Sequence, residues 1–269
     1  MRRADPPDLR AAAAACNEAP HPTSPTRSRS EPMPTLVLLR HGQSQWNLED
    51  RFTGWVDVDL SAQGEAEARR GGELIAEAGL QFDRCFASVL TRAIRTADLA
   101  LAACGQLWIP IEKDWRLNER HYGGLTGLNK AETAAKHGTQ QVMAWRRSYD
   151  IPPPSMAPGS PYDVSGDRRY AGIEAPATET LKSTLERVQP YWDSEIAARL
   201  NAGERLLIAA HGNSLRAIVK LLFAVSDSDI PGVEIPTGNP LLIALDSALR
   251  PTAARYLDER RAQAIPASA

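Results

Sequence analysis

Two short apolar runs in this 269-residue chain each end at a histidine followed by glycine. Leu36 to Leu39 leads through Arg40 into His41-Gly42, and Leu206 to Ala210 leads directly into His211-Gly212. Apolar runs of this length are typical of strands buried in a parallel sheet. Because ligands bind beside the carboxyl ends of such strands, the sequence predicts that both imidazoles meet in one crevice there.

The rest of the chain from Thr35 onward alternates short apolar runs with longer amphipathic segments, as βαβ units do. This pattern predicts an α/β fold, a three-layer α/β/α sandwich with a mostly parallel six-stranded sheet. We expect strands over residues 35–39, 84–87, 108–111, 205–210, 241–245 and 253–257.

Helix ends can be recognised between these strands. Ser61 is placed to cap a helix that ends at Gly79, and Thr91 opens one that ends at Gly105. Further helices are expected from Asn129 to Gly138 and over 178–200, the second despite Pro190. Residues 115–128 and 151–176 lack periodicity, and we expect ordered loops over the carboxyl edge of the sheet.

The two ends of the chain differ from this pattern. Residues 1–32 are dominated by Pro, Ser, Ala and Arg, which predicts a disordered N-terminal extension. A transit peptide and a dispensable tail ahead of Met33 both remain open interpretations. We expect one catalytic domain at 33–258 and a short flexible C-terminal tail at 259–269.

Composition excludes several classes of protein. A formal net charge of −2 argues against a nucleic-acid partner and against a polybasic membrane binder. No apolar stretch approaches the roughly 20 residues that cross a bilayer. The cysteines Cys16, Cys85 and Cys104 are odd in number and lack metal-ligand spacing, which predicts a reducing, cytoplasmic location.

The residue types near the two histidines fit phosphoryl transfer. A neutral imidazole whose other N–H is held by a backbone carbonyl can attack phosphorus, and the adjacent Arg40 favours His41 for this role. His211 would then be protonated and would stabilise the transferring group. Arg40, Arg92 and the pair Arg146-Arg147 could bind the phosphoryl oxygens.

Two further groups complete this hypothesis. Glu119, in a glycine-bearing loop, is the best-placed carboxylate to move a proton on and off a substrate hydroxyl. Asn213 or Ser214, at the start of the helix after His211, would add amide and dipole stabilisation. Each arginine taken alone is more often a salt-bridge partner, so the hypothesis depends on the set.

Several motifs resemble those of the cofactor-dependent phosphoglycerate mutases of the histidine phosphatase superfamily. They include 39–47 (LRHGQSQWN), 51–55 (RFTGW), 88–92 (SVLTR), 145–149 (WRRSY) and 210–214 (AHGNS), and the match runs from about Pro34 to Leu257. The Arg-His-Gly signature specifies only the superfamily. The Trp145-Arg146-Arg147 segment with the proline run after it, and Lys130, point to the mutase branch.

The resemblance implies a reaction and a role for each matching residue. It implies interconversion of 3-phosphoglycerate and 2-phosphoglycerate in glycolysis and gluconeogenesis, primed by 2,3-bisphosphoglycerate, without a metal. His41 would be phosphorylated, with His211, Arg40, Arg92 and Glu119 as the other catalytic residues. The implied substrate-binding residues are Ser44, Asn47, Thr53, Gly54, Tyr122, Lys130, Arg146, Arg147, Gly212 and Asn213. A homo-oligomer, dimer or tetramer, is also implied.

Two alternatives stay open at this point. A phosphomonoester phosphatase of the same fold would release phosphate and need no priming. A catalytically silent phosphate-binding protein is the other, although intact Arg40, His41, Arg92, Glu119 and His211 argue against it. The chain also departs from the family over 155–177 and in its short end after Leu257, which leaves the balance between mutase and phosphatase turnover open.

Overall fold

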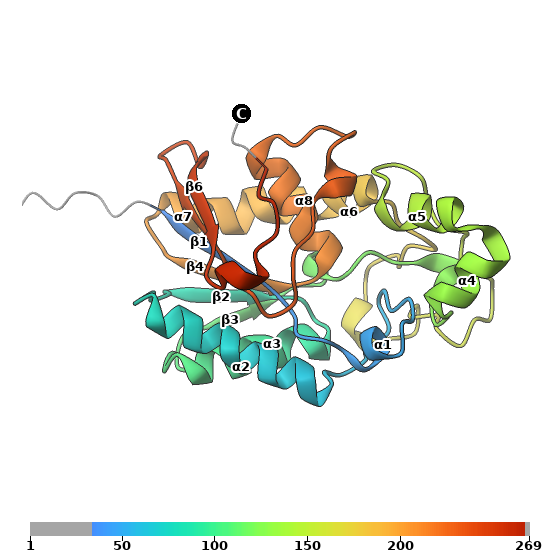
Figure 1. The fold of residues 1–269 in the computed structure, drawn as a ribbon, viewed down its shortest axis with the longest axis horizontal. Helices are drawn as coiled ribbons and strands as arrows, with labels where there is room; N and C mark the ends of the chain where they lie inside the picture. The colour runs from blue at the N-terminus through green and yellow to red at the C-terminus, as the bar shows by residue number, and fades with distance from the viewer. Residues whose placement is uncertain (1–33, 267–269) are drawn as a thin grey trace, which may run out of the picture. The chain divides into compact units, whose positions relative to one another are not determined.

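The structure of the chain is a computed structural model that describes residues 34–266. The predicted N-terminal extension at 1–32 lies outside the described residues. The described part contains a six-stranded sheet in the order β3-β2-β4-β1-β5-β6 (Figure 1). These strands are β1 (Thr35–Arg40), β2 (Arg84–Ala87), β3 (Ile111–Lys113), β4 (Leu206–Ala210), β5 (Leu241–Leu245) and β6 (Pro251–Tyr256).

The sheet is mixed, with a parallel part and an antiparallel margin. β1 pairs with β4, β4 with β2 and β2 with β3 in parallel, whereas β5 pairs antiparallel with both β1 and β6. The predicted α/β fold with a mostly parallel sheet is therefore confirmed. Strand bounds agree within two residues, except that β3 begins only where the predicted strand at 108–111 ends.

The third strand was misplaced because a side chain fixes the segment before it as a turn. Gln106 Oε1 accepts from the amide of Phe82 at 2.7 Å, and Gln106 Nε2 donates to the carbonyl of Leu80 at 2.9 Å. Trp108 consequently points into solvent, with 80% of its surface exposed. Hydropathy alone does not reveal such a contact between distant residues.

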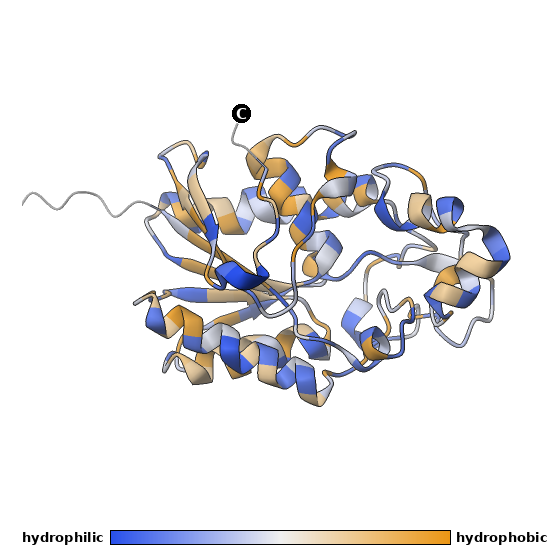
Figure 2. Cartoon of the chain, viewed as in Figure 1, coloured by the Kyte–Doolittle hydropathy of each residue, from blue (hydrophilic) through white to orange (hydrophobic). Residues whose placement is uncertain are grey.

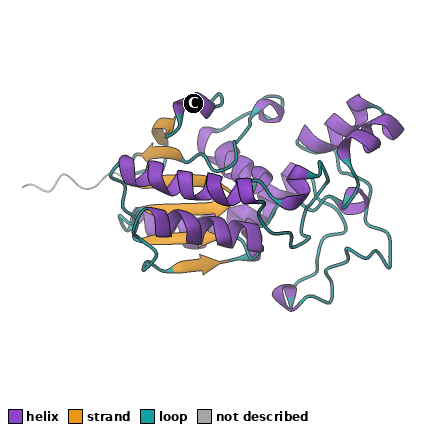
Figure 3. Cartoon of the chain, turned by 60° about the horizontal axis from the view of Figure 1, so that its bottom comes forward, coloured by secondary structure: helices purple, strands orange, loops and turns teal. Residues whose placement is uncertain are grey.

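Helices cover both faces of the sheet. α2 (Ala62–Glu77) and α3 (Thr91–Ala103) lie across one face, as Figure 3 shows, and α6 (Leu181–Tyr191), α7 (Ala197–Asn201) and α8 (Gly212–Phe223) cover the other. Strand β1 divides its side chains between these two cores, because successive residues of a strand point to opposite faces. The alternation of hydrophobic and hydrophilic residues along α2 and α8 is visible in Figure 2.

The predicted helix ends can be compared with the structure. Ser61 caps α2 by accepting from the amide of Gly64 at 3.1 Å, and Asn129 caps α4 (Lys130–His137) through the amide of Glu132. The helix expected over 178–200 starts instead at Leu181. Its backbone stays helical to Asn201, but a π turn at Trp192–Ile196 separates α6 from α7. That turn follows Pro190, which lacks the N–H that an α-helix requires.

The segments beyond the strand ends carry short elements. They are α1 (Gln45–Leu48), α4, α5 (Thr139–Arg147) and the 3₁₀ turns Trp115–Leu117, Gly123–Leu125, Arg168–Tyr170 and Ile230–Gly232. α5, which the sequence did not predict, follows α4 directly at Gly138, whose φ is +86°. Within the predicted C-terminal tail, Glu259–Arg261 forms a further 3₁₀ turn, and Arg261 Nη2 donates to the carbonyl of Thr237 at 2.6 Å.

Candidate active site

The register of the sheet brings the two histidines together. Leu39 pairs with Ala209 and Arg40 with Ala210, so His41 and His211 leave adjacent parallel strands at the same step. The amide of His41 donates to the carbonyl of Ala210 at 2.9 Å. The two ring centroids are 4.9 Å apart in an edge-on arrangement, as expected from the paired His-Gly motifs.

The His41 ring is oriented for attack. Its Nδ1 lies 2.7 Å from the carbonyl oxygen of Gly42. A carbonyl only accepts, so Nδ1 carries the hydrogen and Nε2 keeps its lone pair. Burial, together with the positive charges of Arg92 and Arg40, holds the pKa of His41 well below its usual 6.5. The ring is therefore neutral near pH 7, the state that a nucleophilic imidazole needs.

His211 has different surroundings. Its Nε2 lies 2.7 Å from Ser88 Oγ, and the amide of Leu90 donates to the same oxygen at 3.2 Å. Burial, Arg92 and His41 hold the pKa of His211 well below 6.5. Without a bound anion the ring is therefore neutral near pH 7, and the protonated His211 expected beside a phosphoryl group stays a prediction for the ligand-bound site. Its Nδ1 is buried and has no partner among the described residues.

Arg92 is fixed at the start of α3. Its Nη1 donates to the carbonyl of Val56 at 2.9 Å and its Nη2 to the carbonyl of Gly54 at 2.7 Å. The residue is 1% exposed, and burial lowers its pKa to about 10, so it stays cationic at neutral pH. Gly54, a predicted substrate-binding residue, therefore holds Arg92 through its carbonyl.

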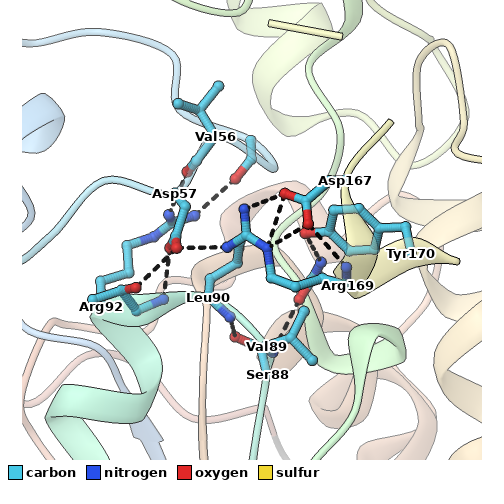
Figure 4. Close-up of polar contacts among 12 residues, drawn as sticks. Val56, Asp57, Ser88, Val89, Leu90, Arg92, Asp167, Arg169 and Tyr170 are labelled. Atoms are coloured by element: carbon cyan, nitrogen blue, oxygen red, sulfur yellow. Dashed lines mark hydrogen bonds and ion pairs between the residues drawn. The ribbon is translucent and has the colours of Figure 1, made fainter. Parts of the chain in front are cut away.

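An ion-pair cluster supports the same helix end (Figure 4). Asp57 accepts from the amide and the hydroxyl of Thr91, the residue that opens α3. The guanidinium of Arg169, from the long loop at 151–176, pairs with both Asp57 and Asp167. This loop is thereby joined to the turn that carries Arg92.

Glu119 is held by the amino end of α8. Its Oε1 accepts from the amide of Asn213 at 3.1 Å and from that of Arg120 at 2.7 Å. Amides at a helix N-terminus favour a carboxylate there. Arg187 Nη2 fixes the loop from behind by donating to the carbonyl of Glu119 at 3.0 Å. The carboxylate is 8% exposed and borders the cavity described next.

A cavity of about 130 Å³ opens in front of His41. Among the described residues it is lined by seven cations, Arg40, Arg51, Arg92, Lys130, Arg146, Arg147 and Arg216, by the carboxylates of Glu119 and Glu234, and by His41, Asn47, Phe52, Thr53, Tyr122, Gly212, Asn213 and Ile235. Such an excess of positive charge in a small cavity suits a ligand that carries several negative charges.

Two predicted substrate-binding residues lie beside the cavity rather than in its lining. Ser44 caps α1, where its Oγ accepts from the amide of Asn47 and its own amide donates to Asn47 Oδ1. Gly54 holds Arg92 as described above. The other predicted substrate-binding residues line the cavity.

Sequence reasoning missed five lining residues, of which Arg216 is the most informative. Arg216 is 3% exposed and donates through Nη1 to Asn213 Oδ1 at 2.9 Å. The signal available in the sequence was an arginine three residues after Asn213, a spacing that places both side chains on one face of α8. The other missed residues are Arg51, Phe52, Glu234 and Ile235.

Some donors around the cavity lack a protein partner. Within the described part of the chain, the buried Nε atoms of Arg40 and Arg216, two residues of the cavity lining, make no hydrogen bond. Unpaired buried donors are costly, and an anion in the cavity would offset the positive charge of these two guanidinium groups. Residues 34–266 contain no group of three or more His, Cys, Asp or Glu side chains able to hold a metal ion.

Comparison with known proteins agrees with this chemistry. The model of the histidine phosphatase superfamily (branch 1) matches residues 36–247, and the chain belongs to that superfamily. A 2,3-bisphosphoglycerate-dependent phosphoglycerate mutase of Caulobacter vibrioides is 72% identical over 234 residues, 87% of this chain and 99% of the relative. The enzyme of the same name from Zymomonas mobilis is 63% identical over 85% of this chain and 100% of its own length.

Solved structures of lower similarity share the fold. A mycobacterial hydrolase superposes with a TM-score of 0.63 at 22% identity, covering 87% of this chain and 99% of the other. The alpha-ribazole phosphatase of Shigella flexneri gives a TM-score of 0.61 at 19% identity, covering 86% of this chain and 98% of the other.

Among residues 34–266, the helices are too short or too polar for any of them to span a bilayer.

Proposed function

We propose that this chain interconverts 3-phosphoglycerate and 2-phosphoglycerate, in glycolysis and gluconeogenesis, through a phosphohistidine at His41. The observation that carries the proposal is the neutral Nε2 of His41 beside a cavity lined by cations and a buried carboxylate. Relatives that are 58% to 72% identical over at least 85% of this chain are named as 2,3-bisphosphoglycerate-dependent phosphoglycerate mutases.

The proposed transfer uses groups with distinct tasks. The Nε2 lone pair of His41 forms the N–P bond while the P–O bond of the substrate breaks. Glu119 takes the proton of the hydroxyl that attacks the phosphohistidine, and it returns that proton to the departing oxygen when the phosphoryl group goes back to His41. Arg40, Arg92 and Asn47 stabilise the charge on the phosphoryl oxygens, and the unprotonated His211 becomes a donor as that charge raises its pKa.

The residues fit 2,3-bisphosphoglycerate as the priming ligand. The unpaired Nε atoms of Arg40 and Arg216 offer donors beside the cavity. Arg40 and Arg92 would hold one phosphate, and Lys130, Arg146 and Arg147 the other, together with the substrate-binding residues already named. When bound, this ligand supplies the phosphoryl group that charges His41. The role of the chain's own cations is to retain both phosphates.

The proposal also covers the domain that carries the activity, the location of the protein and its assembly. We assign the activity to residues 33–258 and include a cytoplasmic location and a homo-oligomer, dimer or tetramer, with no nucleic-acid partner. The net charge of −2 and the residue usage of the chain support the location and the absence of nucleic acid. The oligomer rests on the family resemblance, and sedimentation of the purified protein tests it.

A phosphomonoester phosphatase of the same superfamily is the alternative, and it is not favoured, because the relatives of high identity carry the mutase name. One experiment separates the two. The protein is incubated with 2,3-bisphosphoglycerate, its acid-labile phosphoryl group is measured, and isomerisation is assayed with a chelator present. We expect a phosphohistidine and undiminished isomerisation. Phosphate release without isomerisation would establish the phosphatase, and loss of activity under chelation would overturn the metal-free chemistry.

A further inference from the structure

One carboxylate in the cavity has no task in the transfer described above. Glu234 lines the cavity, and its Oε2 lies 2.7 Å from Arg147 Nη2. The side chain of Glu234 is 45% exposed and that of Arg147 26% exposed. The site must attract anions, yet the negative charge of Glu234 pairs with Arg147, one of the cations proposed to hold the ligand.

The backbone of Glu234 is fixed, whereas its side chain reaches solvent. Tyr256 Oη donates to the carbonyl of Glu234 at 3.2 Å, and Arg40 Nη1 donates to the carbonyl of Ile235 at 2.8 Å. The amide of Gly238 donates in turn to the carbonyl of Arg40 at 3.0 Å. The segment is thus tied to the catalytic strand, and the carboxylate can leave Arg147 by rotation of its own side chain into water.

The ion pair is not needed to hold α5 in place. Arg120 Nη2 donates to the carbonyl of Arg146 at 2.8 Å, and Arg216 Nη2 donates to the carbonyl of Arg147 at 3.3 Å. These contacts join the last turn of α5 to the body of the protein without Glu234. Loss of the carboxylate therefore frees the Arg147 guanidinium while its backbone stays positioned.

We propose that Glu234 acts as the exchangeable counter-anion of Arg147. The proposal rests on the proposed function, since it concerns the end of the cavity that binds the group not being transferred. A carboxylate and a phosphate present similar oxygen pairs to a guanidinium fork, so a ligand anion must displace Glu234 to bind Arg147. The competition weakens binding of anionic groups at this end, which lets ligands exchange there.

The test measures anion binding rather than turnover. Inorganic phosphate and 3-phosphoglycerate are titrated calorimetrically into the wild type, Glu234→Gln and a charge-matched control, Glu73→Gln. Glu73 lies on α2, where it pairs with Arg70 outside the site. We expect Glu234→Gln to lower the Kd for both probes about fivefold, the scale of a partly exposed ion pair. Glu73→Gln leaves the Kd unchanged.

A second background assigns the effect to Arg147. In Arg147→Gln, adding Glu234→Gln should change the Kd by less than about twofold, because the competed cation is gone. An unchanged or higher Kd in Glu234→Gln, or an undiminished gain in the Arg147→Gln background, overturns the proposal. A wild type that binds both probes but does not isomerise overturns the proposed function instead, and the Kd comparison still decides the role of Glu234.

Discussion

The two ends of the cavity are built in different ways. The catalytic end stands on the carboxyl ends of β1 and β4 and the first turn of α3, and there His41, Arg92 and Glu119 are at most 8% exposed. The opposite end is carried by α4 and α5, where Lys130 and Arg147 are partly exposed. Arg92 is held by backbone carbonyls, whereas Lys130 pairs with Asp50 and Arg147 with Glu234.

The two ends of the cavity meet two different requirements of the reaction. Bond making requires donors that are already oriented where charge develops, and carbonyl-held buried groups provide this. Turning a ligand over requires groups that can release one anion and take another, and partly exposed cations with carboxylate partners provide that. Substitutions at the two ends test this division.

The largest effect is expected for His41→Ala. The variant loses the atom that receives the phosphoryl group, so isomerisation should fall by about 10⁴-fold or more. The assay follows isomerisation and the acid-labile phosphoryl group, with circular dichroism to verify folding. Turnover at the wild-type level in a folded variant would remove the catalytic role of this end.

Glu119→Gln should be the next most severe. The amide keeps the shape and can still accept at Oε1 from the amides of Asn213 and Arg120, but it cannot transfer a proton. A general acid and base contributes up to about 10⁴-fold, and we expect a fall in kcat near 10³-fold. The KM should change little. A large rise in KM with unchanged kcat would instead make Glu119 a binding residue.

The sequence was sufficient to predict that the two histidines meet, because its signals are local. A buried strand, a histidine and a glycine are consecutive, and the parallel pairing of β1 with β4 then places both rings together. The opposite end was less accessible. Arg146 and Arg147 were candidates from their residue type and from the resemblance, whereas α5 was not predicted, and the places of Arg216 and Glu234 became visible only through contacts between segments distant in sequence. The same limitation misplaced β3, because Gln106 bonds to Leu80 and Phe82. For Ser44 the structure shows a local cap of α1, a role that the resemblance did not indicate.

Replacing both Arg146 and Arg147 by glutamine tests the opposite end. Isomerisation requires both phosphates to be retained, whereas release of phosphate from a small ester uses the catalytic end alone. We expect about a 10²-fold loss of isomerisation, from two charge-assisted contacts, and less than about a tenfold loss of ester hydrolysis. Equal losses in the two assays would contradict the division between the ends.

Stability at low pH should reveal the burial of the catalytic end. The pKa values of His41 and His211 are both held below 6.5 in the folded protein. The unfolded chain therefore binds protons first as the pH falls through 6.5. The free energy of unfolding has its full value above that pH and declines below it. Each ring contributes at most about 1.4 kcal/mol per pH unit. Denaturant unfolding from pH 7.5 to 5.5 measures the slope.

The matched variant for this slope is His211→Asn. Removing one of the two depressed groups should make the fall in unfolding free energy below pH 6.5 shallower, whatever its effect at pH 7.5. A slope identical to that of the wild type would show that His211 does not resist protonation on folding.

The smallest effect is expected where the long loop meets the catalytic end. In Arg169→Lys the charge remains, but one ammonium cannot reproduce the forked contact of the guanidinium with Asp57 and Asp167. Asp57 accepts from Thr91 at the start of α3, so a looser Asp57 lets Arg92 move slightly. Because Arg92 is proposed to act on the transferring group, kcat should fall about threefold with little change in KM. Arg168→Lys, an exposed neighbour in the same turn, is the control and should retain full kcat. A loss shared equally by both variants would mean that the loop contributes only general stability, and the carbonyl contacts of Arg92 would then suffice to orient it.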